Sequence, residues 1–186
     1  MTRVKQLLLG RETTTLLALV LVLAVFSVLN PAYLTGANFL DILDQATING
    51  LLALGITFVI ITGGIDLSVG SVMAVVIVVV GLLMTEFHVP PIVAVPAGIA
   101  LGIVIGLING ALVTRFKLQP FIATLATMSI FRGVAYIITG GWPVLDMPPS
   151  FRAMLDGDLL GAFPIAVIIL LAFAAVGHVV LTRTKT

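Results

Sequence analysis

Long apolar runs separated by short polar links dominate the sequence. A helix needs roughly 20 mostly apolar residues to cross about 30 Å of hydrocarbon. Six runs approach that length, and each ends at a proline, at glycines or at charged residues. The pattern predicts helical spans at residues 13–29, 42–62, 69–84, 91–113, 120–139 and 162–181.

Composition indicates where these helices lie. Hydrophobic residues make up 60% of the 186-residue chain and charged residues only 9%, whereas soluble domains carry about 25% charged residues. We therefore predict an all-α integral membrane protein, a bundle of about six transmembrane helices that forms a single domain over residues 1–186. The net charge of +1 gives no sign of a nucleic-acid surface, and the absence of cysteine excludes disulfides and thiolate metal sites.

The basic residues assign the links to two sides of the membrane. Lys and Arg accumulate on the cytoplasmic side of short loops. Here they cluster before the first span, after the fourth and after the sixth, as Arg3, Lys5 and Arg11, then Arg115 and Lys117, then Arg183 and Lys185. An even number of spans separates these clusters, so all three fall on one side. We expect a multi-pass protein of the bacterial inner membrane with both termini in the cytoplasm.

The stretch GGIDLSVGS interrupts the apolar pattern between the second and third spans. This stretch contains three glycines, Gly63, Gly64 and Gly70. They predict a helix break at Gly63–Ser68. Because an unpaired backbone group in hydrocarbon costs several kcal/mol, such a break must lie against protein or water. Asp66 or Ser68 can cap the next helix by accepting its first N–H groups. A purely structural cap and a broken helix that lines a solute pathway are both open interpretations.

Polar residues inside other spans are further candidates for a pathway or gate. Arg132 is the only basic residue within a span, and such a residue faces the bundle, pairs, or reaches the interface. Gln45, Asn49 and Asn109 need hydrogen-bond partners, either as contacts between helices or as solute ligands. The candidate substrate-pathway residues are thus Asp66, Ser68, Arg132, Asn109, Asn49 and Gln45.

Two glycine patterns concern helix packing and helix ends. Small residues four positions apart let another backbone approach closely, which predicts a packing face at Gly98, Gly102, Gly106 and Gly110. The run Ile-Ile-Thr-Gly-Gly occurs at residues 60–64 and again at 137–141. It indicates either an inverted repeat or a shared way to end a helix with a left-handed glycine.

Enzyme chemistry has no sequence support. The chain contains no phosphate-binding loop, no cluster with metal-ligand spacing and no Ser/His/Asp set near a plausible site. We predict no catalytic residue, no metal site and no cofactor in this chain. The link at residues 142–161, with its prolines and aspartates, is long enough to form an extracytoplasmic docking surface.

Several stretches together resemble a known family. They are TGGIDLSVGS at 62–71, GLING at 106–110, KLQPFIATL at 117–125, and FRG at 131–133 with TGG at 139–141. The sequence resembles the permease subunits of bacterial ABC importers for ribose and related monosaccharides, a group that includes the autoinducer-2 permeases. The resemblance implies a pair of permease subunits, identical or paralogous, with an extracytoplasmic sugar-binding protein. It also implies two cytoplasmic ATPase subunits, which bind the ATP and drive alternating access.

The resemblance covers about the first half of such a permease. Members of that family continue through a cytoplasmic ATPase-coupling loop and further membrane helices, so we expect a fragment or a second completing polypeptide. Two other functions stay open: an ion-coupled secondary transporter with Asp66 as a proton or cation site, and a membrane scaffold that does not transport. Which sugar is carried does not follow from the sequence.

Overall fold

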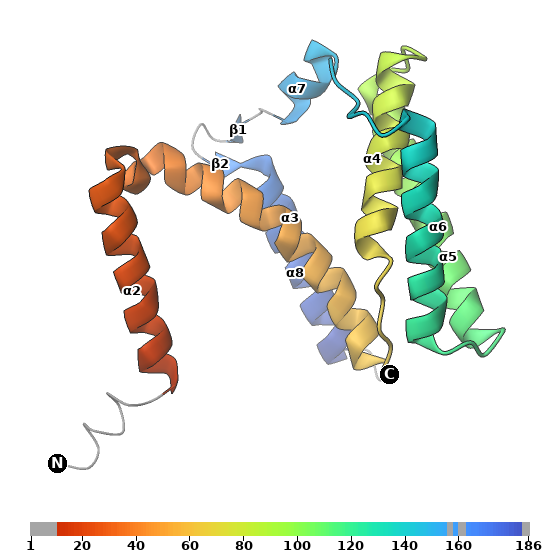
Figure 1. Ribbon diagram of the computed structural model, residues 1–186, viewed down its shortest axis with the longest axis horizontal. Coiled ribbons are helices and arrows are strands. Elements are labelled where there is room, and N and C mark those ends of the chain that lie inside the picture. Colours follow the sequence, from red (N-terminus) through yellow and green to blue (C-terminus); the bar gives the residue numbers. More distant parts are fainter. Residues whose placement is uncertain (1–10, 156–157, 160–162, 184–186) are drawn as a thin grey trace. The chain divides into compact units, whose positions relative to one another are not determined.

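The computed structural model describes residues 11–155, 158–159 and 163–183. Within them the chain forms seven α-helices, one short 3-10 helix and two strands of two residues each (Figure 1). The helices are α2 (Arg11–Leu29), η1 (Pro31–Leu34), α3 (Gly36–Ile61), α4 (Val69–Thr85), α5 (Pro91–Thr114), α6 (Pro120–Thr139), α7 (Pro149–Leu155) and α8 (Ile165–Arg183). Strand β1 (Asp158–Leu159) pairs antiparallel with β2 (Phe163–Pro164). The predicted helical membrane fold with a break before α4 is confirmed.

Helix α3 begins six residues earlier than residue 42, where the hydropathy pattern predicted its start. The hydroxyl of Thr35 accepts the N–H of Asn38 at 3.3 Å, which stabilises the first turn. This turn contains polar residues, so hydropathy alone excludes it from the apolar run. Four predicted features lie outside the described residues: Arg3, Lys5, Lys185 and the predicted start of the sixth span at Ala162.

Four described helices are long and apolar enough to cross a membrane, namely α3, α5, α6 and α8. Two shorter apolar helices accompany them, residues Thr13–Leu29 of α2 and the whole of α4. At 1.5 Å per residue, the 17 residues of α4 extend only about 26 Å, less than a typical hydrocarbon core. By its composition and its long apolar helices, the chain is a multi-pass membrane protein.

The chain divides into two compact units, residues 1–46 and 47–186. In the first, the rings of Phe26 and Tyr33 stack with centroids 5.5 Å apart, which holds η1 against the end of α2. The second unit contains the rest of α3 and all later elements. Whether residues 1–186 act as a single permease domain stays a prediction.

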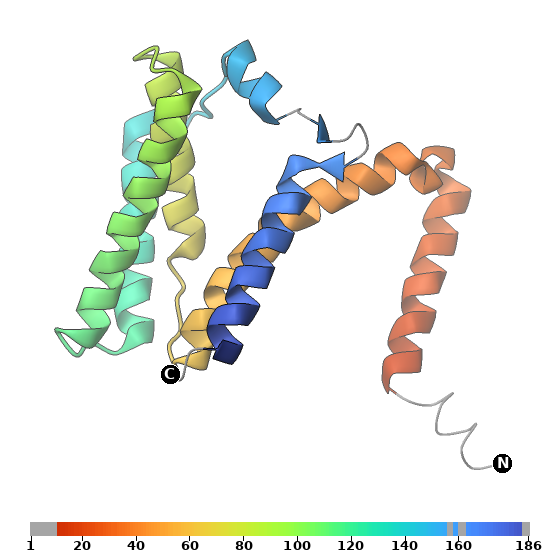
Figure 2. The ribbon, with the colours of Figure 1, turned by 180° about the vertical axis from the view of Figure 1, so that it is seen from behind.

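Helices α4, α5 and α6 pack into a three-helix bundle in the second unit (Figures 1 and 2). Its buried centre consists of one residue from each helix, Val75, Ile105 and Ala135. The contact of α4 with α5 is close because Gly98 has no side chain. A Cβ added there would overlap the side chain of Val80.

Helices α3 and α8 also lie side by side (Figure 2). Here too glycines allow the approach. A Cβ on Gly50 of α3 would meet the side chain of Leu170 at 3.0 Å, and a Cβ on Gly177 of α8 would meet Phe58 at 3.4 Å. Small residues thus set both helix contacts, as expected where the hydrophobic effect does not drive helices together.

Candidate functional site

The first Ile-Ile-Thr-Gly-Gly run ends α3. Gly63 adopts a left-handed conformation, with φ of 77°, and its N–H donates to the Ile60 carbonyl at 2.9 Å. The N–H of Gly64 returns to the Val59 carbonyl at 2.9 Å, so the helix cannot continue. Gly70, predicted as part of the break, instead lies in the first turn of α4, because the Ser68 carbonyl already accepts helical hydrogen bonds from two later residues.

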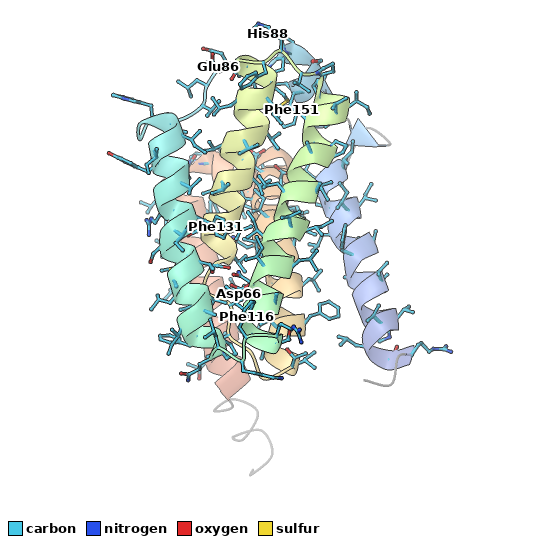
Figure 3. The ribbon with its side chains drawn as sticks, turned by 90° about the vertical axis from the view of Figure 1, so that its right-hand side faces the viewer. Asp66, Glu86, His88, Phe116, Phe131 and Phe151 are labelled. Carbon is cyan, nitrogen blue, oxygen red and sulfur yellow. The ribbon has the colours of Figure 1, made fainter. Side chains whose placement is uncertain are left out.

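Asp66 holds the turn that leads into α4. Its Oδ1 atom accepts the backbone N–H of Ser68 at 2.8 Å and the Ser68 hydroxyl at 2.6 Å. Ser68, one of the two predicted capping residues, is the N-cap of α4, but its side chain makes no capping bond to the backbone. Asp66 bonds to this N-cap residue and not to the first N–H groups of the helix, so the predicted side-chain cap is not formed by either residue. In Figure 3, Asp66 lies toward the end of the bundle where Phe116 is found, opposite Glu86 and His88.

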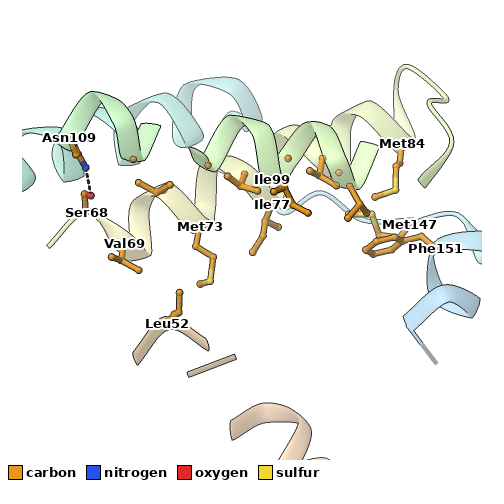
Figure 4. Close-up of a pocket in the computed structure, with 18 of the residues that line it drawn as sticks. Leu52, Ser68, Val69, Met73, Ile77, Met84, Ile99, Asn109, Met147 and Phe151 are labelled. Carbon is orange, nitrogen blue, oxygen red and sulfur yellow. Dashed lines mark hydrogen bonds between the residues drawn. The ribbon is translucent and has the colours of Figure 1, made fainter. Parts of the chain in front are cut away.

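Asn109 connects this turn to α5. Its Nδ2 atom donates to the Ser68 hydroxyl at 2.7 Å (Figure 4), a contact between residues 41 positions apart. Ser68 is fully buried and Asn109 is 6% exposed. The three side chains form a continuous hydrogen-bonded series, Asn109 to Ser68 to Asp66. Three of the predicted pathway residues are thereby brought together.

Thr124 holds the break from the side of α6. Its hydroxyl faces two carbonyl oxygens, that of Ile65 at 3.1 Å and that of Pro120 at 2.8 Å, and the side chain is buried. Thr124 is not among the site candidates that the sequence indicated, although it lies within the stretch KLQPFIATL. A threonine within a helix ordinarily bonds the carbonyl four residues earlier, so its residue type does not distinguish it. Its long-range contact with Ile65 does.

A cavity of about 580 Å³ lies beside the start of α4. Asp66, Ser68 and Asn109 line it, and its other lining residues are apolar or glycine. Figure 4 shows Ser68 and Asn109 toward one end of this cavity and Met84, Met147 and Phe151 toward the other. The site is therefore a largely apolar groove with a single polar end.

The remaining pathway candidates are not part of this groove. Arg132 is exposed on α6 and makes no hydrogen bond or ion pair with the described part of the chain. Asn49 is exposed on α3, and Gln45, in the first unit, is exposed on the same helix. Neither amide has a hydrogen bond to a described residue. A role for these three residues in transport stays a prediction.

The four glycines of α5 differ in their surroundings. A Cβ on Gly98 would collide with Val80, and one on Gly102 would lie 3.8 Å from Val76. At Gly106 and Gly110 an added Cβ would meet no heavy atom within 4 Å. Gly98, Gly102 and Gly106 all line the cavity. The glycine face thus packs closely at one end and leaves open space at the other.

A second hollow of about 810 Å³ lies at the opposite end of the bundle. Glu86, His88, Asp146 and the exposed Trp142 contribute to its wall. The described residues contain no group of three or more His, Asp or Glu side chains placed to hold a metal ion. This hollow includes part of the link predicted as a docking surface.

Comparison with known proteins gives consistent matches. Residues 38–186 match the family described as branched-chain amino acid transport system / permease component. The chain is 43% identical over 160 residues to the ribose import permease protein RbsC of Bacillus subtilis, covering 84% of this chain and 49% of that protein. It is 36% identical over 168 residues to the autoinducer 2 import system permease protein LsrC of Shigella flexneri, covering 89% and 49% respectively.

A further relative is the ribose import permease protein RbsC of Haemophilus influenzae, 35% identical over 177 residues, which are 93% of this chain and 54% of that protein. The chain thus spans about half the length of the curated relatives it matches. No solved structure matches it.

Proposed function

The chain belongs to the permease-component family of branched-chain amino acid transport systems, and on that premise we propose that it is the membrane-spanning permease subunit of an ATP-driven ABC importer. Its cargo is a monosaccharide or a related small polyol or sugar signal. The chain itself is not an enzyme, since ATP is bound and hydrolysed on separate ATPase subunits.

One observation carries this proposal. The chain is 43% identical over 160 residues to a ribose import permease, a protein that is named for the import of a sugar. The similarity to an autoinducer 2 import permease over 168 residues supports the same class of cargo. In both cases the aligned segment is long enough to include most of the helices of the second unit.

The site suggests how this subunit contributes to transport. A backbone break within an apolar helical protein is tolerated where it faces protein or water. Asp66, Ser68 and Asn109 place three polar side chains at one end of the groove, and we assign them to the solute route. Alternating access would open this route to one side of the membrane at a time, each state being selected by its partners. Arg132, Asn49 and Gln45 are proposed to act at a gate or at contacts with other subunits.

The proposed assembly contains a second permease subunit, two cytoplasmic ATPase subunits and an extracytoplasmic sugar-binding protein. The basic links face the cytoplasm of a bacterial inner membrane with both termini inside. The hollow with Glu86, His88 and Trp142 then faces outward, and we assign it to contact with the binding protein.

Uptake measurements test this function. The permease is expressed together with an ATPase and a sugar-binding protein of a ribose import system in cells lacking ribose uptake, and entry of radiolabelled D-ribose is followed. We expect uptake that stops when ATP is depleted and persists when a protonophore collapses the ion gradients while ATP is maintained. Uptake that follows the ion gradient would favour a secondary transporter, and no uptake of ribose or autoinducer 2 would contradict the proposal.

A further inference from the structure

The polar end of the groove has an unused hydrogen-bond acceptor. Asn109 is 6% exposed, and its Oδ1 atom is buried without a partner among the described residues. The amide orientation is fixed by its neighbours, since the Ser68 hydroxyl donates to Asp66 and so must accept from the Asn109 Nδ2 atom. A buried acceptor without a donor is costly, so such atoms normally have a partner.

The other polar groups at this end cannot supply the missing donor. The hydroxyl hydrogen of Ser68 and the backbone N–H of Ser68 both already bond to Asp66 Oδ1. Within the part of the chain that the structure describes, no Lys, Arg or His lines the cavity. The polar end therefore offers a carboxylate and an amide oxygen, both acceptors, and no positive charge. A solute with a carboxylate or phosphate group would find no ionic partner here, whereas one with several hydroxyl donors would.

We propose that Asp66 and Asn109 form a binding subsite for a neutral, hydroxyl-rich solute. One solute hydroxyl donates to the Asp66 carboxylate and another donates to Asn109 Oδ1. This inference rests on the proposed transport function and specifies the chemistry of its cargo. It also separates hydroxylated cargo from amino acids, which the general description of the family includes and whose carboxylate the subsite leaves unpaired.

The burial of Asn109 Oδ1 links binding to conformation. Asp66 is half-buried and open to the cavity, but the Asn109 oxygen is sealed in the described state. One turn away, Gly106 lines the cavity and a Cβ there would have no heavy atom within 4 Å, so a solute has room beside Asn109. A solute that bonds Asn109 Oδ1 needs a state in which this oxygen is unsealed, and binding shifts the population toward that state.

A binding measurement tests the subsite without the binding protein. The purified permease–ATPase complex is heated with and without D-ribose at high millimolar concentration, and with D-ribonate, its carboxylate analogue. We expect D-ribose to raise the melting temperature of the wild-type complex, D-ribonate to leave it unchanged, and Asn109→Leu to abolish the shift. Gln119→Leu, which removes an exposed amide at the start of α6 that makes no capping bond and lies outside the cavity, serves as the control and should keep the shift.

A transport measurement with deoxy analogues provides the second test. At saturating solute-loaded binding protein, the rate reflects the permease, so we compare D-ribose with its monodeoxy analogues. In the wild type, we expect that removal of the solute hydroxyl that donates to Asn109 Oδ1 slows transport about tenfold. In the Asn109→Leu variant, removal of the same hydroxyl should cause no further loss of rate. Asn109→Ala also removes the acceptor oxygen, and it replaces the leucine variant if the latter does not assemble.

The outcomes separate the two proposals. Normal D-ribose uptake combined with an unchanged melting shift in both Asn109 variants, or a stronger shift with D-ribonate, would overturn the subsite and leave the transport function standing. A wild-type complex that D-ribose does not stabilise would also overturn the subsite. Absence of any ATP-dependent sugar uptake would overturn the transport function itself.

Discussion

Two helices in this chain end with the same five residues, Ile-Ile-Thr-Gly-Gly, yet the segments that follow differ completely. Both ends use a left-handed glycine, Gly63 with φ of 77° and Gly140 with φ of 62°. After Gly63, the chain enters a link whose Asp66 and Ser68 bond to each other and to α5. After Gly140, the chain leads to Trp142, which is 78% exposed.

This difference shows which features depend on the local sequence and which depend on tertiary contacts. The helix end is local, because a glycine with positive φ and the hydrogen bonds of the last turn suffice to form it. The buried polar site after the first end depends on Asn109 and Thr124, which are 41 and 59 residues away from their partners. An inverted repeat is therefore not needed to explain the shared run, since both copies serve as helix ends.

The largest predicted effect is on the Asp66 carboxylate. Asp66→Ala removes the acceptor of two hydrogen bonds and leaves the buried Ser68 hydroxyl without its acceptor. The two lost hydrogen bonds and the unsatisfied buried group together should lower the free energy of unfolding by about 2–4 kcal/mol. Chemical denaturation of the purified complex in detergent measures this change.

The matched control lies in the second link. Asp146 is exposed and has a positive φ of 61°, a conformation that asparagine tolerates, so Asp146→Asn should change stability by less than about 0.5 kcal/mol. Equal effects at the two aspartates would mean that the first link is not held as described.

The next largest loss of stability is expected at Thr124, and Thr139 of the same helix serves as its comparison. Thr124→Val removes the hydroxyl that donates to Ile65 and Pro120, and we expect a loss of about 1–2 kcal/mol because the Ile65 carbonyl loses its donor. Thr139→Val removes a hydroxyl that bonds only within its own helix end, and should cost no more than about 0.5 kcal/mol. The same denaturation experiment measures the loss of stability in both variants. A larger loss in Thr139→Val than in Thr124→Val would contradict this account.

The smallest difference in stability between the two helix ends is expected when Gly63 and Gly140 are substituted. Gly63→Ala and Gly140→Ala introduce a Cβ into the left-handed region without a close steric contact. Each should therefore cost a similar amount, about 1–2 kcal/mol. Uptake by membranes with matched permease content should fall for Gly63→Ala alone, because the first link carries Asp66 and Ser68 at the polar end of the groove. Reduced uptake in the Gly140 variant alone would contradict this assignment.

Much of the fold was predictable because its signals are local. Apolar runs bounded by Pro91, Pro120 and Gly140 give the limits of α5 and α6 to within one residue. The start of α3 was misplaced because capping by Thr35 lets the helix include polar residues. The break at Gly63 and the N-cap position of Ser68 were predictable from residue type and spacing, but the side-chain capping bond was wrong, because Asp66 bonds to Ser68 and not to the first turn of α4.

The candidate site was predictable only in part. Asp66, Ser68 and Asn109 were singled out as polar residues in an apolar chain, but their hydrogen-bonded series depends on how α4 and α5 pack. Thr124 was missed because its local sequence is that of an ordinary helical threonine. Arg132 was expected to act near the same route, yet it lies on the exposed side of α6. Side-chain chemistry identifies candidates, and tertiary packing selects among them.

Water access beside the break tests the central claim most directly. The chain has no cysteine, so a single one can be introduced at Val69, which lines the groove, or at Val134, which is exposed on α6 outside it. Val69 is the first residue of α4, and Val134 lies in the second half of α6, so a second comparison uses Leu125, which is exposed on α6 outside the groove and follows Thr124, the residue that bonds Ile65. In intact membranes we predict fast reaction of Val69→Cys with a water-soluble thiol reagent and slow reaction of Val134→Cys and Leu125→Cys. Reaction at Val69→Cys no faster than at Leu125→Cys would contradict a hydrated route at the Asp66 break.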